Sequence, residues 1–148
     1  MRPPTPSTFQ ATEIFRNGIG IEVVFSDTNV ASLDLLPSEF RDAAGMGARA
    51  AGWSLNEGSD FVVVVTLASV PQLHEDLDAV RVRVQAGGHA AGAGVEQTYG
   101  GGIVAAKIVE IPRSERALIL STTQHLARSV AAKLRMALLK DALQAPDR

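Results

Sequence analysis

The segment GSDFVVVVTLASV (residues 58–70) is the most strand-like run in the chain. It starts with a turn signal, Gly58-Ser59-Asp60, and continues into five consecutive aromatic or β-branched residues, Phe61 to Val65. Such side chains lose rotamer freedom in a helix. An apolar run without alternation is typical of a strand that is covered on both faces or along much of its length. We predict that this segment is the central strand of a sheet.

Composition limits the class of protein. The chain has 148 residues, of which 46% are hydrophobic and 20% are charged. This length allows one domain with a substantial core, and the composition is too apolar for a disordered chain. We expect a Pro-rich tail over residues 1–7 and a single domain over residues 8–145. The formal net charge of −2 gives no overall attraction to nucleic acid or to an anionic membrane.

The absence of cysteine excludes disulfides and thiolate metal sites. No apolar run approaches the roughly 20 residues of a transmembrane helix. The first residues, MRPPTPS, lack the apolar core of a secretory signal. We expect a cytoplasmic protein if Met1 is the natural start, and a cell-envelope protein if the sequence is a mature form recloned behind a new methionine.

The N-terminal segment favours a β-hairpin. Apolar and polar residues alternate between Thr8 and Arg16, and Ile19–Phe25 resumes a strand pattern. Asn17-Gly18 between these arms is the dipeptide that best tolerates the left-handed backbone of a tight turn. Replacement of Gly18 by valine should therefore lower stability.

A first helix is expected between Asp34 and Ala51. Pro37 suits the first helical turn, and Gly52 suits the residue that ends a helix. One face at helical spacing consists of Phe40, Ala44, Gly47 and Ala51. Because this face is mostly small, the helix can lie close to what it covers, which we expect to be the sheet. Trp53, the only tryptophan, is expected to fill the core with its N–H bonded near the edge.

The second half of the chain predicts a meander and a final helix. Alternation from Val80 to Ala86 indicates a strand with one wet face, followed by a strand at Ile103–Ile111 and a short one at Ala117–Ser121. From about Thr123 to Leu143, apolar residues return at helical spacing. With the hairpin, this order predicts a single two-layer α+β domain, with a mainly antiparallel sheet and two helices on one face.

A glycine-rich interval spans residues 87–102. Backbone without side chains can wrap a phosphate or a ligand carbonyl, although no G-x-x-x-x-G-K-[ST] pattern is present. A long hairpin loop or a bulged strand pair is the favoured alternative. The candidate ligand-loop residues are Gly87, Gly88, His89, Gly92, Gly94, Tyr99, Gly100, Gly101 and Gly102.

No catalytic, nucleotide or metal signature is complete. Residues 45–50, GMGARA, have the letters of a dinucleotide fingerprint, but they fall inside the expected first helix, which favours tight helix packing. His74, His89 and His125 lack convergent ligand spacing, and the serines lack a nucleophile-elbow context. We expect no catalytic residues, no metal site and no cofactor, and a non-enzymatic role is favoured.

The final helix carries two apolar stripes. The first should face the sheet and consists of Leu126, Val130, Leu134 and Leu138. A helix that is apolar on two sides must bury both, so the second stripe predicts either contact with the N-terminal tail or a partner surface. The candidate interface consists of Met136, Leu139 and Leu143, with Lys133 and Lys140 at its polar rim.

The order of these elements resembles one known family. A strand, a helix that closes at Gly52-Trp53, the motif Gly58-Ser59-Asp60-Phe61-Val62-Val63, a meander and a terminal helix are similar to the small periplasmic α/β domain of the curli secretion-pore subunit and related outer-membrane lipoproteins. The likeness covers about residues 20–140. Unlike members of that family, the printed sequence shows no signal-peptide pattern, no lipid-accepting cysteine and no long pore-forming strands. The resemblance implies an assembly role in which copies pack side by side, and it assigns no functional residue.

Three functions remain open. The leading one is a non-catalytic structural or interaction module that forms a homo-oligomer or binds a protein partner, with the second stripe and the exposed sheet face as candidate contacts. The second is a small-molecule-binding or small enzymatic domain that uses residues 87–102. The third is nucleic-acid binding through Arg81, Arg83 and the basic C-terminal helix, where aromatic stacking residues are absent.

Overall fold

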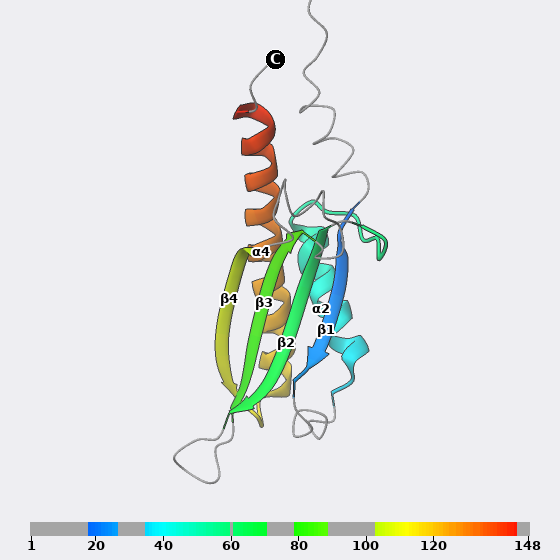
Figure 1. Ribbon diagram of the computed structural model, residues 1–148. Helices are drawn as coiled ribbons and strands as arrows, with labels where there is room; N and C mark the ends of the chain where they lie inside the picture. The colour runs from blue at the N-terminus through cyan, green and yellow to red at the C-terminus, as the bar shows by residue number, and fades with distance from the viewer. Residues whose placement is uncertain (1–17, 27–34, 60, 71–78, 89–102, 145–148) are drawn as a thin grey trace, which may run out of the picture.

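The computed structural model describes residues 18–26, 35–59, 61–70, 79–88 and 103–144. In chain order, its elements are β1 (Gly20–Phe25), α2 (Pro37–Ala50), β2 (Phe61–Val70), β3 (Ala79–Gly88), β4 (Ile103–Pro112) and α4 (Arg116–Gln144). The strands form a four-stranded sheet in the order β1-β2-β3-β4, and both helices lie against the same face (Figure 1). The predicted two-layer α+β domain is confirmed.

The sheet is mixed and mostly antiparallel. β1 pairs in parallel with β2, whereas the pairs β2–β3 and β3–β4 are antiparallel. Parallel neighbours need a crossover connection, and α2 lies in the connection between β1 and β2. β2 has a neighbour on each side, so the prediction that residues 58–70 contain a central strand is confirmed.

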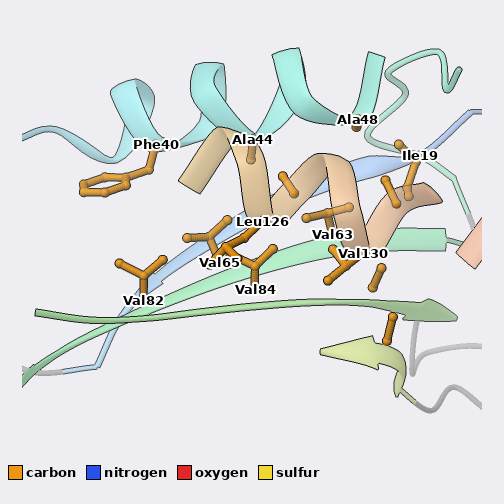
Figure 2. Packing of buried hydrophobic residues seen from close by; sticks show 14 of the residues in the cluster. Ile19, Phe40, Ala44, Ala48, Val63, Val65, Val82, Val84, Leu126 and Val130 are labelled. Atoms are coloured by element: carbon orange, nitrogen blue, oxygen red, sulfur yellow. The ribbon is translucent and has the colours of Figure 1, made fainter. Parts of the chain in front are cut away.

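The core lies between the sheet and the two helices (Figure 2). Alternate residues of β2 are buried on the helix side and are Phe61, Val63, Val65 and Leu67. The stripe of α4 predicted to face the sheet is also buried, with Leu126 5% exposed and Val130, Leu134 and Leu138 fully buried. The intervening β2 residues are half-buried, so one face of the central strand is covered by helices, not both.

The N-terminal hairpin prediction needs correction where the structure describes it. Its first arm, Thr8–Arg16, lies outside the described residues. Ile19 donates its N–H to the Ser54 carbonyl at 2.8 Å and accepts the N–H of Asn56 at 2.9 Å. The N–H of Ile19, which would close a two-residue hairpin turn after Gly18, is therefore bonded to the segment between α2 and β2, and Asn17 lies outside the described residues. Gly18 does have the expected positive φ, +81°.

The predicted short strand at Ala117–Ser121 is wrong, because α4 begins at Arg116 and includes these residues. The helix starts where Ile119 donates its N–H to the Glu115 carbonyl at 2.9 Å. Ile119 and Thr123, one turn apart, are fully buried, and the Thr123 hydroxyl donates to the Ile119 carbonyl. A short apolar run fits a strand or a buried helix segment equally well, and the helical spacing continues only in the residues that follow.

The small face of α2 packs on α4 as well as on the sheet. A Cβ atom added at Gly47 would lie 2.8 Å from the backbone nitrogen of Arg128 and 3.0 Å from the Ala127 Cβ. The two helix backbones therefore approach closely at Gly47, which confirms tight helix packing for this glycine, whereas Gly45 faces the Leu55 side chain. At the start of α2, the Glu39 carboxylate accepts the Leu36 N–H at 2.7 Å. Leu35, directly before Leu36, is buried.

The C-terminal end of α2 is stabilised by α4. Gly52 has φ +96° and donates its N–H to the Arg49 carbonyl at 2.9 Å, which confirms it as the residue that ends the helix. The Arg135 guanidinium donates to the Ala51 carbonyl at 3.3 Å. A cation at this end also suits the negative pole of the helix dipole.

Candidate functional site

The segment between α2 and β2 fixes the start of the sheet. Ser59 donates its hydroxyl to the Gly18 carbonyl and accepts the N–H of Phe61 at 3.1 Å. It is 8% exposed. The Ser59 hydroxyl therefore joins the entries of β1 and β2.

Trp53 fills the core beside this segment. Its indole N–H donates to the Ala131 carbonyl of α4 at 2.9 Å, and only 3% of the residue is exposed. Its ring lies 6.2 Å from that of Phe61, centroid to centroid. The predicted role, a core tryptophan with a bonded N–H, is confirmed.

A shallow, open depression lies beside the entries of β1 and β2. Its walls are formed by Gly20, Ile21, Glu22, Arg41, Glu57, Ser59, Phe61 and Val62. Arg41 and Glu57 face each other at 3.9 Å with side chains 53% and 85% exposed, an arrangement that contributes little stability. The one hydroxyl in its walls belongs to Ser59 and is engaged, so these residues do not form a nucleophile with an adjacent base.

Of the candidate ligand loop, the structure describes only Gly87 and Gly88, which are the last residues of β3. The register of the β3–β4 pair shifts between Ala86 and Gly87. This irregularity fits the alternative of a bulged strand pair at the start of the interval. The other predicted residues lie outside the described part of the chain, and they are His89, Gly92, Gly94, Tyr99, Gly100, Gly101 and Gly102.

Neither a group of metal ligands nor a membrane-spanning helix is found among the described residues. No three His, Asp or Glu residues there are grouped so that they could hold a metal ion. His125 is exposed on α4, whereas His74 and His89 lie outside this part of the chain. None of the described helices is both long and apolar enough to cross a membrane.

The predicted basic surface is partly used inside the fold. Arg81 binds Glu110 on the neighbouring strand, with N–O distances of 3.0 and 3.2 Å. Arg135 is held at the end of α2 by its bond to Ala51. Lys133 and Arg128 are exposed on α4. Arg81 and Arg135, two of the cations available for nucleic-acid binding, therefore already have partners, which weakens that alternative.

The second stripe of α4 reaches the surface as far as the structure describes it. Met136 is 67% exposed, Leu139 is half-buried and Lys133 is exposed. Lys140 and Leu143 belong to α4, but their side chains lie outside the described part. The stripe lies away from the fully buried Leu134 and Leu138, as its helical spacing requires.

The second predicted contact is the face of the sheet opposite the helices, whose residues could not be listed from the sequence. In Figure 1 this face is turned toward the viewer, with no described helix in front of it. Exposed or half-buried residues alternate with the core residues along all four strands and are Glu22, Val24, Val62, Val64, Thr66, Ala68, Arg81, Arg83, Gln85, Ala106, Ile108 and Glu110. We call this set the open face. The alternation within each strand predicts which of its residues point away from the core, but the pairing register is needed to show which residues of different strands lie side by side.

No family model matches the chain, and no curated protein matches it. Among solved structures it is similar to a PelC dodecamer from Paraburkholderia phytofirmans, at 10% identity and a TM-score of 0.47 over 80% of this chain and 87% of that chain. It is also similar to the hypothetical protein CT253 from Chlamydia trachomatis, at 13% identity and a TM-score of 0.40 over 84% and 99% of the two chains. These likenesses fit a resemblance of architecture and do not single out the curli secretion-pore subunit. At such TM-scores they carry no argument about function.

Proposed function

We propose that this protein is a non-catalytic module that associates with copies of itself through the second stripe of α4. The observation that carries the proposal is the 67% exposure of Met136 on a helix whose opposite face is built into the core. Apolar side chains grouped on an exposed helix face are typical of an interaction surface. Leu139 and Leu143 follow Met136 at intervals of three and four residues, so the three lie on one face.

The position of this stripe around α4 keeps it off the sheet, because Leu134 and Leu138 on the opposite side of the same turns are fully buried. The length of α4 adds to its exposure. At about 1.5 Å per residue, the 29 residues of α4 extend about 43 Å. The ten residues of β2 extend about 33 Å. The C-terminal turns of α4, orange to red in Figure 1, accordingly extend past the ends of the strands.

The chemistry of the stripe suits a modest protein–protein contact. Burial of one such apolar side chain contributes on the order of 1.5–3 kcal/mol. The three apolar side chains of the stripe, contributed by each copy, would stabilise a symmetric contact. Lys133 is exposed next to the stripe and would belong to a polar rim, together with Lys140.

Solution mass as a function of concentration tests this proposal. The wild-type chain should associate, and Met136→Asp should raise the dissociation constant by about tenfold or more, since one lost apolar contact is worth at least 1.4 kcal/mol. Leu139→Asp should act in the same direction. Met46→Asp is the matched control, because it makes the same substitution at a methionine that is 56% exposed on α2 and is not part of the stripe.

Two results would overturn the proposal. One is a wild-type chain that stays monomeric at high concentration. The other is a folded Met136→Asp variant with wild-type association. Leu139 is half-buried, so a Leu139→Asp chain that unfolds would assign Leu139 to the core, and the more exposed Met136 would then decide alone.

A further inference from the structure

The open face carries two charges that the fold does not use. Arg81 and Glu110 form an ion pair with each other at 3.0 Å. Glu22 and Arg83 are exposed and have no ion-pair partner within the described residues. The first lies on β1 and the second on β3, on opposite sides of the central strand β2. The face therefore presents opposite charges on its two sides.

Apolar side chains occupy much of the space around these charges. Ile108 is 55% exposed and Val24 is 37% exposed, on the two outer strands. Val62 and Val64 are half-buried on β2. A sheet face of this composition has a partly apolar centre and opposite charges beside it, which suits contact with a second protein surface.

We propose that the open face packs against the open face of a second copy, related by a two-fold axis that runs along β2. The register places Glu22 and Gln85 level with Val64, on opposite sides of β2. Rotation about β2 exchanges these sides, so β1 of each copy lies over β3 of the other. Glu22 then lies about two residues, or 7 Å, along the strand from Arg83 of the second copy. That distance is within reach of an arginine side chain, and the symmetry forms the pair twice.

Charge argues against the other two-fold arrangement of two faces. An axis perpendicular to the strands would lay β1 over β1 and β3 over β3. Glu22 would then lie toward Glu22 of the second copy, and Arg83 toward Arg83. Like charges that face each other destabilise a contact, whereas the axis along β2 pairs opposite charges and lays Val64 over Val64.

The area of the open face sets the strength of this contact. Strands of ten residues extend about 33 Å, and four strands spaced about 4.8 Å apart are about 19 Å wide. Because β1 is shorter, each copy contributes about 500–600 Å², close to the roughly 1,000 Å² in total at which specific interfaces begin. The contact is therefore weak alone, and the inference rests on the self-association proposed through α4.

Exchange of the two charges tests the pairing. In analytical ultracentrifugation of the full chain, Glu22→Arg and Arg83→Glu should each weaken association about tenfold, and the double variant should return to within about threefold of wild type. Glu115→Arg is the control, because Glu115 is exposed just before α4 and changes net charge equally. Single variants that associate like wild type, or a double variant that stays weak, would overturn the inference.

Cross-linking tests the axis. The chain has no cysteine, so Val64→Cys introduces a single thiol. Packed sheets are about 10 Å apart, and a bismaleimide of that span should link two copies at this position. Ser38→Cys, exposed at the start of α2 in the helix layer and outside the second stripe of α4, should give no such product. A Val64→Cys chain that is not cross-linked would contradict the two-fold axis along β2.

The two contacts fail separately. Loss of association in Met136→Asp with no effect of the charge variants would leave the α4 proposal standing and overturn the open-face contact. If the charge-exchanged double variant recovers association and Met136→Asp has no effect, the open-face contact stands and the α4 proposal is overturned. A monomeric wild-type chain would overturn both.

Discussion

The contact between α2 and α4 predicts opposite effects for two glycines that are two residues apart. A Cβ at Gly47 would lie 2.8 Å from the backbone nitrogen of Arg128, and backbone in a helix cannot move aside easily. A Cβ at Gly45 would lie 2.9 Å from Cδ1 of Leu55, the end of a flexible side chain that is 39% exposed. Both glycines are inside α2, so replacement by alanine brings each the same intrinsic helix gain of about 1 kcal/mol.

Because this gain is shared, the difference between the two variants measures packing. Forced overpacking costs about 1–3 kcal/mol. We expect Gly45→Ala to raise the free energy of unfolding by about 0.5–1 kcal/mol. We expect Gly47→Ala to lower it by about 1 kcal/mol, so the two differ by about 2 kcal/mol, or roughly 6 °C in melting temperature for a chain of this size.

Urea unfolding followed by circular dichroism measures the free energy of unfolding of each variant, and thermal unfolding measures its melting temperature. Protein concentration must be the same throughout, because association would stabilise the folded state. If Gly47→Ala stabilises the protein as much as Gly45→Ala does, the helices do not approach closely at Gly47 and the reasoning is refuted.

Two further substitutions test the segment around β1 and β2. Gly18→Val should lower the free energy of unfolding by about 3 kcal/mol, because φ is +81° and a Cβ would lie 3.1 Å from the Ser54 carbonyl carbon; an unchanged melting temperature would contradict this. Trp53→Phe should cost about 2–3 kcal/mol through the lost bond to Ala131 and the smaller ring. Circular dichroism is the readout for the second variant, since it removes the only tryptophan, and a cost below about 0.5 kcal/mol would contradict the core role.

Long elements with one periodicity can be predicted from the sequence. β2 combines aromatic and β-branched residues over its first half, and α4 repeats apolar residues at helical spacing from about Thr123 to Leu143. Trp53 and Gly52 could also be interpreted, since each residue type has a narrow set of structural roles. In these places local preference and tertiary structure agree.

The pairing of β1 could not be predicted, because local and long-range preferences disagree there. Asn17-Gly18 is a strong hairpin signal, but the groups of Ile19 that would close the hairpin bind Ser54 and Asn56. Strand direction follows from the connection, and the α2 crossover makes β1 parallel to β2. At Ala117–Ser121 the apolar run is too short for its period to be recognised.

The candidate surfaces differ in the same way. The second stripe of α4 could be found because all its members lie on one helix. The open face could be expected as the uncovered side of the sheet, but its residues could not be listed, because they come from four strands and meet only through the register. Glu22 and Arg83 are separated by 61 positions in the chain, and nothing in either neighbourhood indicates that they lie on one face.

The positions of the two proposed contacts determine what kind of assembly they can form. The open face and α4 lie in opposite layers of the domain (Figure 1). A two-fold contact uses the same surface on both copies and ends there, so either contact alone gives a dimer. Two different two-fold contacts on opposite sides of one domain instead leave a free surface on every copy that joins. Assembly then continues until the symmetry closes or the chain of copies is interrupted. If both proposals hold, the full chain should therefore form species larger than a dimer, and the loss of either contact should limit it to dimers.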